Sequence, residues 1–263
     1  GVRLVGSEMC IRDRPNKIVL YVKKLTGEGN MFREVCVENL TSIERMLQAG
    51  VDRVELCDNL YVGGTTPSLG VIEQAKEITK RYKKELAVII RARGGDFKYK
   101  DFEKYAMFQD IVYAAKAGVD RLVIGALKDS EKVKRGKSIG LEVDYNWIFL
   151  AIRKAKNIKP DMKFTFHMAF DHIESVKMRL EAIEKLSQLG IDTILTHGSK
   201  SKNDIFENVD NITEYIKRAK DVNMTIMLGG GVDYEKSIEL YKNIPNLTHV
   251  HGTRIVEDIW LNM

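Results

Sequence analysis

Cysteine, proline and long apolar runs are all scarce in this chain of 263 residues. Its three cysteines, Cys10, Cys36 and Cys57, are too few and too unevenly spaced for a disulfide framework, which favours a reducing, cytoplasmic compartment. Four prolines and a hydrophobic content of 44% are typical of a globular domain and exclude a fibrous or disordered chain. No apolar run approaches the roughly 18 residues of a membrane span, so we expect no membrane partner.

The charges are nearly balanced and well mixed along the chain. The sequence holds 42 basic and 37 acidic residues, a formal net charge of +5, and no basic arm or stripe stands out among them. Nucleic-acid binding depends on such a concentrated basic surface. We therefore expect no nucleic-acid partner.

Both ends of the chain are unusual. Residues 1–15 lack helical or alternating apolar periodicity and look like a translated sequencing-adapter peptide, while residues 26–30 are of the kind that a purine-rich ribosome-binding tract encodes. We therefore predict that residues 1–30 are a non-native or disordered extension and that Met31 is the native start, with a genuine N-terminal extension as the alternative. Only a short segment follows His251, which predicts either a brief closing helix or a chain clipped at its C-terminus.

An internal repeat indicates the architecture. AGVDRVEL at 49–56, AGVDRLVI at 117–124 and LGIDTILT at 189–196 each read as a helix end, a glycine stop and a buried strand. Gly50, Gly118 and Gly190 lie 68 and 72 residues apart, and each interval has room for two strand–helix units of about 30 residues or more. Two units per interval predict eight in all.

The apolar pattern supplies these eight strands, separated by helical segments such as 102–116 and 175–189. The strands are expected near 32–37, 51–57, 86–91, 120–126, 162–167, 191–196, 224–228 and 247–251. Alternating strands and helices predict an α/β fold with a parallel sheet, and we favour a single-domain TIM (β/α)8 barrel over residues 31–263. An open doubly wound sheet is the alternative, but no Gly-x-Gly-x-x-Gly motif follows the first strand.

Polar residues recur two positions apart in or just after several predicted strands, and such residues share one face. The pairs are Glu34 with Cys36, Glu55 with Cys57, Arg91 with Arg93, Thr165 with His167, and His249 with His251. We expect these pairs to point inward at the carboxyl ends of the strands, where barrel enzymes carry their sites. Isolated buried charges are costly, so the glutamates and arginines are expected to pair, either as a catalytic site or as a structural polar layer.

Glycine-rich loops follow several of these strands. Gly229, Gly230 and Gly231 precede a helical pattern, and Gly252 and Thr253 follow the eighth strand, where barrels commonly bind phosphate. With Arg93, these residues form the predicted anion-binding set. Ordinary turn glycines are the alternative interpretation.

Two further groups suggest chemistry. Cys36 and Cys57 are expected at comparable ends of adjacent strands, roughly 5 Å apart, where two thiolates can hold a soft ion such as Cu(I). The alternative is that both are small buried hydrophobes. His167 and Asp171 are a candidate acid–base or ligand pair.

Taken together, these blocks resemble the copper homeostasis protein CutC family. The resemblance rests on EVC at 34–36, DRVELC at 52–57, GGTTPSLG at 63–70, RGGDFKY at 93–99, TFH at 165–167, AFD at 169–171, LTHG at 195–198, GGG at 229–231 and VH at 250–251. It runs in order from Met31 to about His251. It implies a cytoplasmic and usually oligomeric barrel, Cu(I) binding through Cys36 and Cys57, and a site around Glu34, Glu55, Arg91, His167 and Asp171.

The chain departs from the family pattern at three positions. Ala92 stands where the family has proline, Met168 where it has arginine, and His197 where it has serine. The missing arginine weakens a phosphate-substrate interpretation and favours a thiophilic metal, and His197 adds a possible ligand. The family also usually continues past the eighth strand.

Three functions follow. The first is Cu(I) binding in copper homeostasis through Cys36 and Cys57, aided by Met168 or His167. The second is a metal-independent enzyme acting on a small polar, phosphorylated or sugar-like substrate. Its roles would be Glu55 or Glu34 as base, His167 with Asp171 as acid, Arg91 as oxyanion or carboxylate clamp, and the triple glycine as anion cradle. The third is an interaction subunit whose site has decayed. Whether a reaction is catalysed stays open.

Overall fold

The computed structural model describes residues 31–131, 133–134, 137–138, 140–201 and 203–257. The predicted extension over residues 1–30 and the predicted closing segment at 258–263 lie outside these residues. Among the described residues, no helix is both long enough and apolar enough to cross a membrane.

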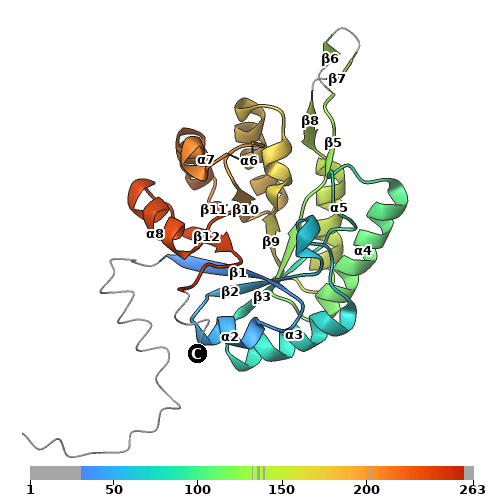
Figure 1. Ribbon diagram of the computed structural model, residues 1–263. Coiled ribbons are helices and arrows are strands. Elements are labelled where there is room, and N and C mark those ends of the chain that lie inside the picture. Colours follow the sequence, from blue (N-terminus) through green and yellow to red (C-terminus); the bar gives the residue numbers. More distant parts are fainter. Residues whose placement is uncertain (1–30, 132, 135–136, 139, 202, 258–263) are drawn as a thin grey trace, which may run out of the picture.

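Eight parallel strands close into a barrel (Figure 1). They are β1 (Phe32–Glu38), β2 (Arg53–Cys57), β3 (Glu85–Ile89), β4 (Arg121–Ile124), β9 (Lys163–Phe166), β10 (Thr193–Thr196), β11 (Thr225–Leu228) and β12 (His249–Gly252). Their order around the barrel is β1-β12-β11-β10-β9-β4-β3-β2, so the first strand pairs with the last. This closure confirms the predicted TIM barrel and excludes the open doubly wound sheet.

Helices form the outer layer of the barrel (Figure 1). The α-helices are α2 (Ile43–Gln48), α3 (Leu69–Arg81), α4 (Asp101–Lys116), α5 (Tyr145–Lys156), α6 (Val176–Leu189), α7 (Val209–Asp221) and α8 (Tyr234–Asn243), and the short 3-10 helices are η2 (Leu60–Val62), η3 (Met168–His172) and η4 (Ile205–Asn208). The glycines of the repeat, Gly50, Gly118 and Gly190, all have positive φ. This confirms their predicted left-handed role between a helix and the strand that follows.

A hairpin that the sequence analysis did not predict projects from the barrel between β4 and α5 (Figure 1). Its lower part pairs β5 (Leu127–Asp129) with β8 (Leu141–Val143), and its upper part pairs β6 (Val133–Lys134) with β7 (Lys137–Ser138), both antiparallel. These strands are two or three residues long and mostly polar. Such strands are too short to show an alternating apolar pattern.

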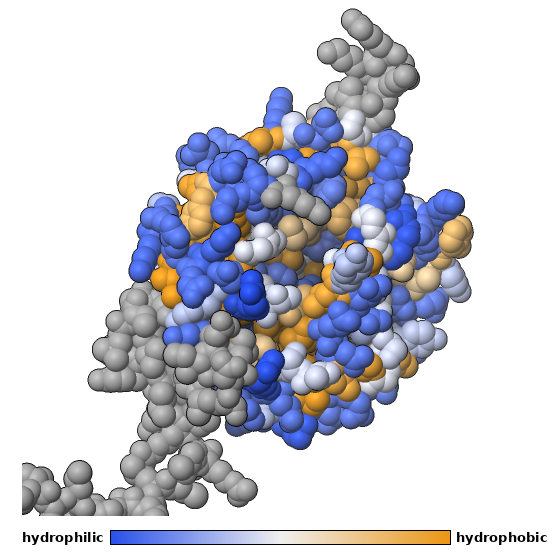
Figure 2. All heavy atoms as spheres, viewed as in Figure 1, coloured by the Kyte–Doolittle hydropathy of each residue, from blue (hydrophilic) through white to orange (hydrophobic). Residues whose placement is uncertain are grey.

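The barrel strands separate an apolar layer from a polar interior. Outward side chains such as Val35, Val54 and Leu56 are fully buried against the helices. Their neighbours along each strand point into the barrel, where the polar side chains of β1, β2 and β12 meet. Figure 2 shows a hollow near the centre of one face of the molecule, with apolar surface inside a hydrophilic rim.

Candidate functional site

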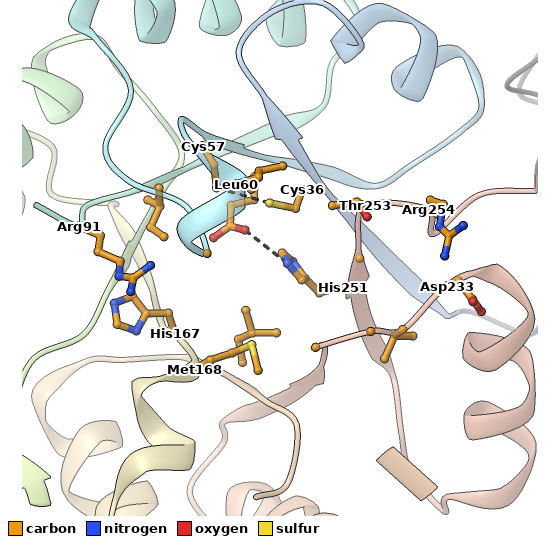
Figure 3. Close-up of a pocket in the computed structure, with 18 of the residues that line it drawn as sticks. Cys36, Cys57, Leu60, Arg91, His167, Met168, Asp233, His251, Thr253 and Arg254 are labelled. Atoms are coloured by element: carbon orange, nitrogen blue, oxygen red, sulfur yellow. Dashed lines mark hydrogen bonds and ion pairs between the residues drawn. The ribbon is translucent and has the colours of Figure 1, made fainter. Parts of the chain in front are cut away.

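A cavity of about 280 Å³ opens at the carboxyl ends of the barrel strands. Its floor includes Cys36, Glu55 and Cys57 from β1 and β2 and His251 from β12, and the loops after β3, β9 and β11 form its walls (Figure 3). This is the end of a parallel barrel at which loops from many strands converge. The cavity is therefore the candidate functional site.

The two cysteines meet at one side of this cavity. The Sγ atoms of Cys36 and Cys57 lie 3.4 Å apart, and both thiols are buried and free of a disulfide. The strand register places Cys36 opposite Glu55 and Cys57 opposite Glu38. The two cysteines, which the sequence analysis expected at comparable ends of adjacent strands, are therefore diagonal neighbours. Their side chains lean together across the strand pair. Gly64 leaves room for the Cys57 side chain, because a Cβ at this position would lie 3.2 Å from the Cys57 sulfur.

His251 completes the cluster, and the sequence analysis did not include it among the site residues. One atom each from Cys36, Glu55 and His251 lie within 4.8 Å of one another. The imidazole Nε2 is 3.5 Å from a Glu55 carboxyl oxygen, and Nδ1 is 2.8 Å from Glu34 Oε1. The predicted closure of the barrel could have indicated this contact. It pairs β1 with β12, and that pairing places Glu34 opposite His251.

Burial and mutual contacts shift the pKa of each side chain in the cluster. Hydrogen bonding from Cys57 lowers the pKa of Cys36 to about 5, against the opposing effect of burial, and His251 lowers it further. The same hydrogen bond and burial hold the pKa of Cys57 well above its usual range. Burial and the Cys36 thiolate raise the pKa of Glu55. Burial alone would lower the pKa of His251, but Glu55, Cys36 and Glu34 raise it well above its ordinary value. The cavity thus favours the thiolate form of Cys36 and the protonated form of His251, while the pKa values of Cys57 and Glu55 are shifted toward their neutral forms.

This charge distribution predicts the pH dependence of the thiol absorbance. In a Cys10→Ser protein, one thiolate should form as the pH rises through about 5 and remain at neutral pH, because the lowered pKa of Cys36 favours its charged form. The measurement is ultraviolet absorbance of the thiolate against pH. Cys36→Ser should abolish this step. A single step near the pKa of a free thiol, about 8.5, would contradict the assignment.

Glu34 lies beneath the cavity and does not face it. Its carboxylate is fully buried and is paired with the guanidinium of Arg53 and with His251. Burial would raise the pKa of Glu34, but Arg53 and His251 together hold it well below its usual range. Glu34 is therefore placed to orient His251 and not to act as the general base that the sequence analysis considered.

Arg91 and Arg93, the two arginines that follow β3, have different partners. Arg91 is buried in the cavity wall, where its Nη1 donates to the carbonyls of Val62 (2.9 Å) and Gly64 (3.0 Å) and its Nη2 donates to that of Gly95 (3.0 Å). The expected carboxylate partner is thus replaced by three backbone oxygens.

The expectation that Arg93 faces inward is wrong. Its Nε donates to Glu103 at 2.6 Å and its Nη2 to Asp96 at 3.0 Å, and its side chain is 38% exposed. The strand ends at Ile89, so the two-residue alternation no longer applies at this position. Arg93 organises its own loop and is not placed to bind an anion in the cavity.

His167 and Asp171 are both buried, but they do not pair as the sequence analysis expected. His167 Nδ1 accepts a hydrogen bond from the Ala169 N–H at 3.2 Å. The Asp171 carboxylate accepts one from the Thr196 hydroxyl and one from the His197 N–H at 2.8 Å. Burial, followed by Arg91, lowers the pKa of His167 to about 3, and burial raises that of Asp171 to about 6. Only His167 lines the cavity, and its low pKa makes it a poor acid at neutral pH.

His197, which the sequence analysis named as a possible ligand, lies in the loop after β10. It follows β10 directly and is buried, with Nδ1 3.3 Å from the carbonyl of Gly229 and Nε2 3.0 Å from that of Asn203. Each ring nitrogen thereby faces a backbone carbonyl oxygen, to which only a protonated nitrogen can donate. This arrangement gives no support to a role as an additional ligand.

The triple glycine is divided between two tasks. Gly230 and Gly231 line the cavity, whereas the N–H of Gly229 donates to the carbonyl of Thr196 and continues the strand pairing. The first turn of α8 is capped by the Asp233 carboxylate, which accepts a hydrogen bond from the N–H of Lys236 at 2.9 Å. A carboxylate at this helix terminus repels a phosphate. The N-terminus of α8 therefore gives no support to the predicted anion-binding site.

Gly252 also has a packing role. A Cβ there would lie 2.0 Å from the carbonyl oxygen of Val232, so the close approach of two loops requires glycine. Gly252 and Thr253 line the cavity, but this contact explains the glycine without an anion. Anion binding by these residues stays a prediction.

These features define a class: TIM-barrel proteins with a buried thiol, carboxyl and imidazole cluster at the carboxyl end of the barrel. Comparison with known proteins makes the assignment more specific. A model of the CutC family matches residues 31–256, so the chain belongs to the CutC family. This confirms the resemblance that the sequence blocks indicated.

Named relatives support the same assignment. A CutC family protein of Enterococcus faecalis is 38% identical over 226 residues, which cover 86% of this chain and 100% of that protein. The human copper homeostasis protein cutC homolog is 35% identical over 207 residues, covering 78% of this chain and 67% of that protein.

Solved structures agree with the fold. The copper homeostasis protein CutC from Streptococcus agalactiae is 37% identical with a TM-score of 0.75, covering 86% of this chain and 100% of that one. A deoxyribose phosphate aldolase from Aeropyrum pernix is 11% identical with a TM-score of 0.61, covering 97% of this chain and 100% of that one, and this likeness shows the fold alone.

Proposed function

We propose that this protein binds Cu(I) at the mouth of its barrel and takes part in cytoplasmic copper homeostasis. The observation that carries the proposal is the 3.4 Å approach of Cys36 Sγ and Cys57 Sγ inside the cavity. Soft sulfur ligands select Cu(I) over hard cations. The names of the relatives, which concern copper homeostasis, point in the same direction.

The chemistry of the donor set fits this ion. Among the residues that the structure describes, Cys36, Glu55 and His251 are the one group of three His, Cys, Asp or Glu side chains placed to hold a metal. The lowered pKa of Cys36 supplies a thiolate at neutral pH. Metal binding can displace the proton of Cys57, which is released to solvent. Hard cations such as Mg²⁺ require more oxygen ligands than this cluster offers.

The compartment and the assembly belong to the same proposal. Two adjacent thiols that must stay reduced suit the cytoplasm. Large apolar side chains are exposed on the neighbouring helices α4 and α5, namely Phe102, Tyr105, Phe149 and Leu150. Exposed apolar clusters commonly mark contacts between proteins, which supports a homo-oligomer.

Competition for Cu(I) against a chromophoric chelator tests the proposal. The reduced Cys10→Ser protein should take one Cu(I) per chain from the chelator. Mg²⁺ at the same concentration should not displace it, because Mg²⁺ prefers oxygen ligands and this site offers two sulfurs. Failure to remove any Cu(I) from the chelator would contradict the proposed function.

A second function is favoured by the size of the cavity. Its volume of about 280 Å³ far exceeds the ~30 Å³ that one water occupies, so an organic molecule fits beside an ion. We propose as the alternative a metal-independent enzyme for a small polar, phosphorylated or sugar-like substrate. Glu55, with Cys36 and His251, is the candidate acid–base group, since Glu34 and Asp171 lie outside the cavity wall and His167 has a low pKa.

A further inference from the structure

Two hydrogen-bond donors in the cavity wall lack the partners that buried donors normally have. Within the described part of the chain, no hydrogen-bond partner reaches Arg91 Nε or His167 Nε2, and both atoms are buried. Each side chain is only 4% exposed, and both line the cavity. A buried donor without a partner is costly, and native proteins rarely keep one without a functional reason.

The proton on the His167 ring can be placed from its neighbours. Nδ1 accepts the hydrogen bond from the Ala169 N–H at 3.2 Å, so this nitrogen carries the lone pair. In a neutral imidazole the hydrogen then sits on Nε2, which is the unpartnered atom. Burial and the nearby Arg91 keep the ring neutral at physiological pH, since they lower its pKa to about 3. His167 therefore carries an N–H without a partner in the wall of the cavity.

Both side chains are held firmly in place. The guanidinium of Arg91 lies 4.9 Å from the centroid of the Phe97 ring, and the His167 ring lies 5.0 Å from the same centroid. Three backbone carbonyls fix the terminal nitrogens of Arg91. The His167 ring packs on Gly125, where a Cβ would lie 2.3 Å from its Cε1 atom. Preorganised donors of this kind bind a ligand without first having to be ordered.

We propose that Arg91 Nε–H and His167 Nε2–H form a subsite that binds the carboxylate of a small organic acid. The cationic guanidinium and a neutral donor favour an anionic oxygen acceptor. The walls beside them are apolar, with Leu60, Ile89 and Phe97, which suits a short carbon chain. Figure 3 places Arg91 and His167 on the side of the cavity away from Cys36. A bound acid would thus direct its other end toward the Cys36, Glu55 and His251 cluster.

This subsite deepens the second proposed function, because it names the group by which that substrate is held. It also requires neither copper nor turnover. The metal-free, reduced protein is therefore the correct sample for its test.

The experiment is a nuclear magnetic resonance titration of protein carrying ¹⁵N-labelled histidine and arginine with acetate, pyruvate and succinate. The Nε2–H signal of His167 and the Nε–H signal of Arg91 should shift together and saturably with at least one of the three acids. His167→Asn keeps a side-chain acceptor for the Ala169 N–H and, because its side chain is shorter, withdraws the donor from the position of Nε2. It should weaken binding by about 10- to 100-fold, the worth of a hydrogen bond to a charged group, in a variant whose circular dichroism shows that it is folded.

His249→Asn is the matched control, because this histidine stacks on Phe32 at the opposite end of β12 and should leave the affinity unchanged. No saturable shift of either signal with any of the three acids would overturn the subsite. So would equal affinity in His167→Asn. Cys36→Ser should weaken Cu(I) binding by about 100-fold or more and retain carboxylate binding, so a failure of the copper proposal is distinguishable. Binding of a probe acid without its conversion would support the subsite, because binding requires no turnover.

Discussion

Replacing either cavity cysteine with serine is expected to weaken Cu(I) binding by about 100-fold or more. Loss of an outer partner alone costs about 10- to 100-fold in metal affinity, and Cys36→Ser or Cys57→Ser removes a sulfur ligand itself. Serine keeps the size of the side chain but offers a hard, protonated oxygen to a soft ion. The measurement is the affinity of the reduced variants for Cu(I) in competition with a chromophoric chelator.

Cys10→Ser is the matched control for this pair. It removes the third thiol of the chain, which lies outside the described residues and belongs to no predicted site. Its affinity for Cu(I) should equal that of the unsubstituted protein. The same affinity in all three serine variants would exclude the cysteine pair as the copper site.

Arg53→Met is expected to destabilise the barrel by about 3–5 kcal/mol. Arg53 and Glu34 form a buried ion pair beneath the cavity, with side chains only 3% and 0% exposed. Removal of the arginine leaves His251 as the remaining partner of the buried Glu34 carboxylate, and breaking a buried ion pair by removing one member carries a penalty of that order. Urea unfolding followed by circular dichroism measures the free energy of unfolding.

Arg93→Met supplies the comparison, because Arg93 forms its ion pairs in an exposed loop. Such pairs contribute about 0–1 kcal/mol. Addition of Glu34→Gln to Arg53→Met should recover part of the lost stability by removing the buried charge. If Arg53→Met costs no more than Arg93→Met, the proposed role of the buried pair is wrong.

The buried layer explains why the site has its shape. The guanidinium of Arg53 forms an ion pair with Glu34, and His251 Nδ1 lies 2.8 Å from the other oxygen of the same carboxylate. His251 Nε2 faces Glu55 in the cavity. Each residue comes from β1, β2 or β12, the three strands that meet at the closure of the barrel. The charge beneath the cavity thus positions the imidazole above it.

The barrel could be predicted from local patterns because its units repeat. The glycine stops at Gly50, Gly118 and Gly190 mark the passage from helix to strand, and the apolar runs after them are long enough to identify. The hairpin between β4 and α5 could not be predicted in this way. Its strands gain stability from pairing with each other and carry little apolar signal.

The candidate site was predictable only where regular strand geometry holds. Glu34, Cys36, Glu55 and Cys57 lie within β1 and β2, so the two-residue alternation places them on inward faces. Arg93 and Asp171 lie beyond the ends of their strands, where loop contacts and the short helix η3 set the side-chain directions. His251 meets Glu34 across 217 residues of sequence, and only the closure of the barrel brings them together.

X-ray absorption at the copper edge, on protein loaded with one Cu(I), tests the central claim most directly. The account predicts two sulfur neighbours of the metal in the Cys10→Ser protein and one in the Cys10→Ser, Cys57→Ser protein. A first shell of nitrogen and oxygen alone, or a sulfur count that the Cys57 substitution leaves unchanged, would contradict it.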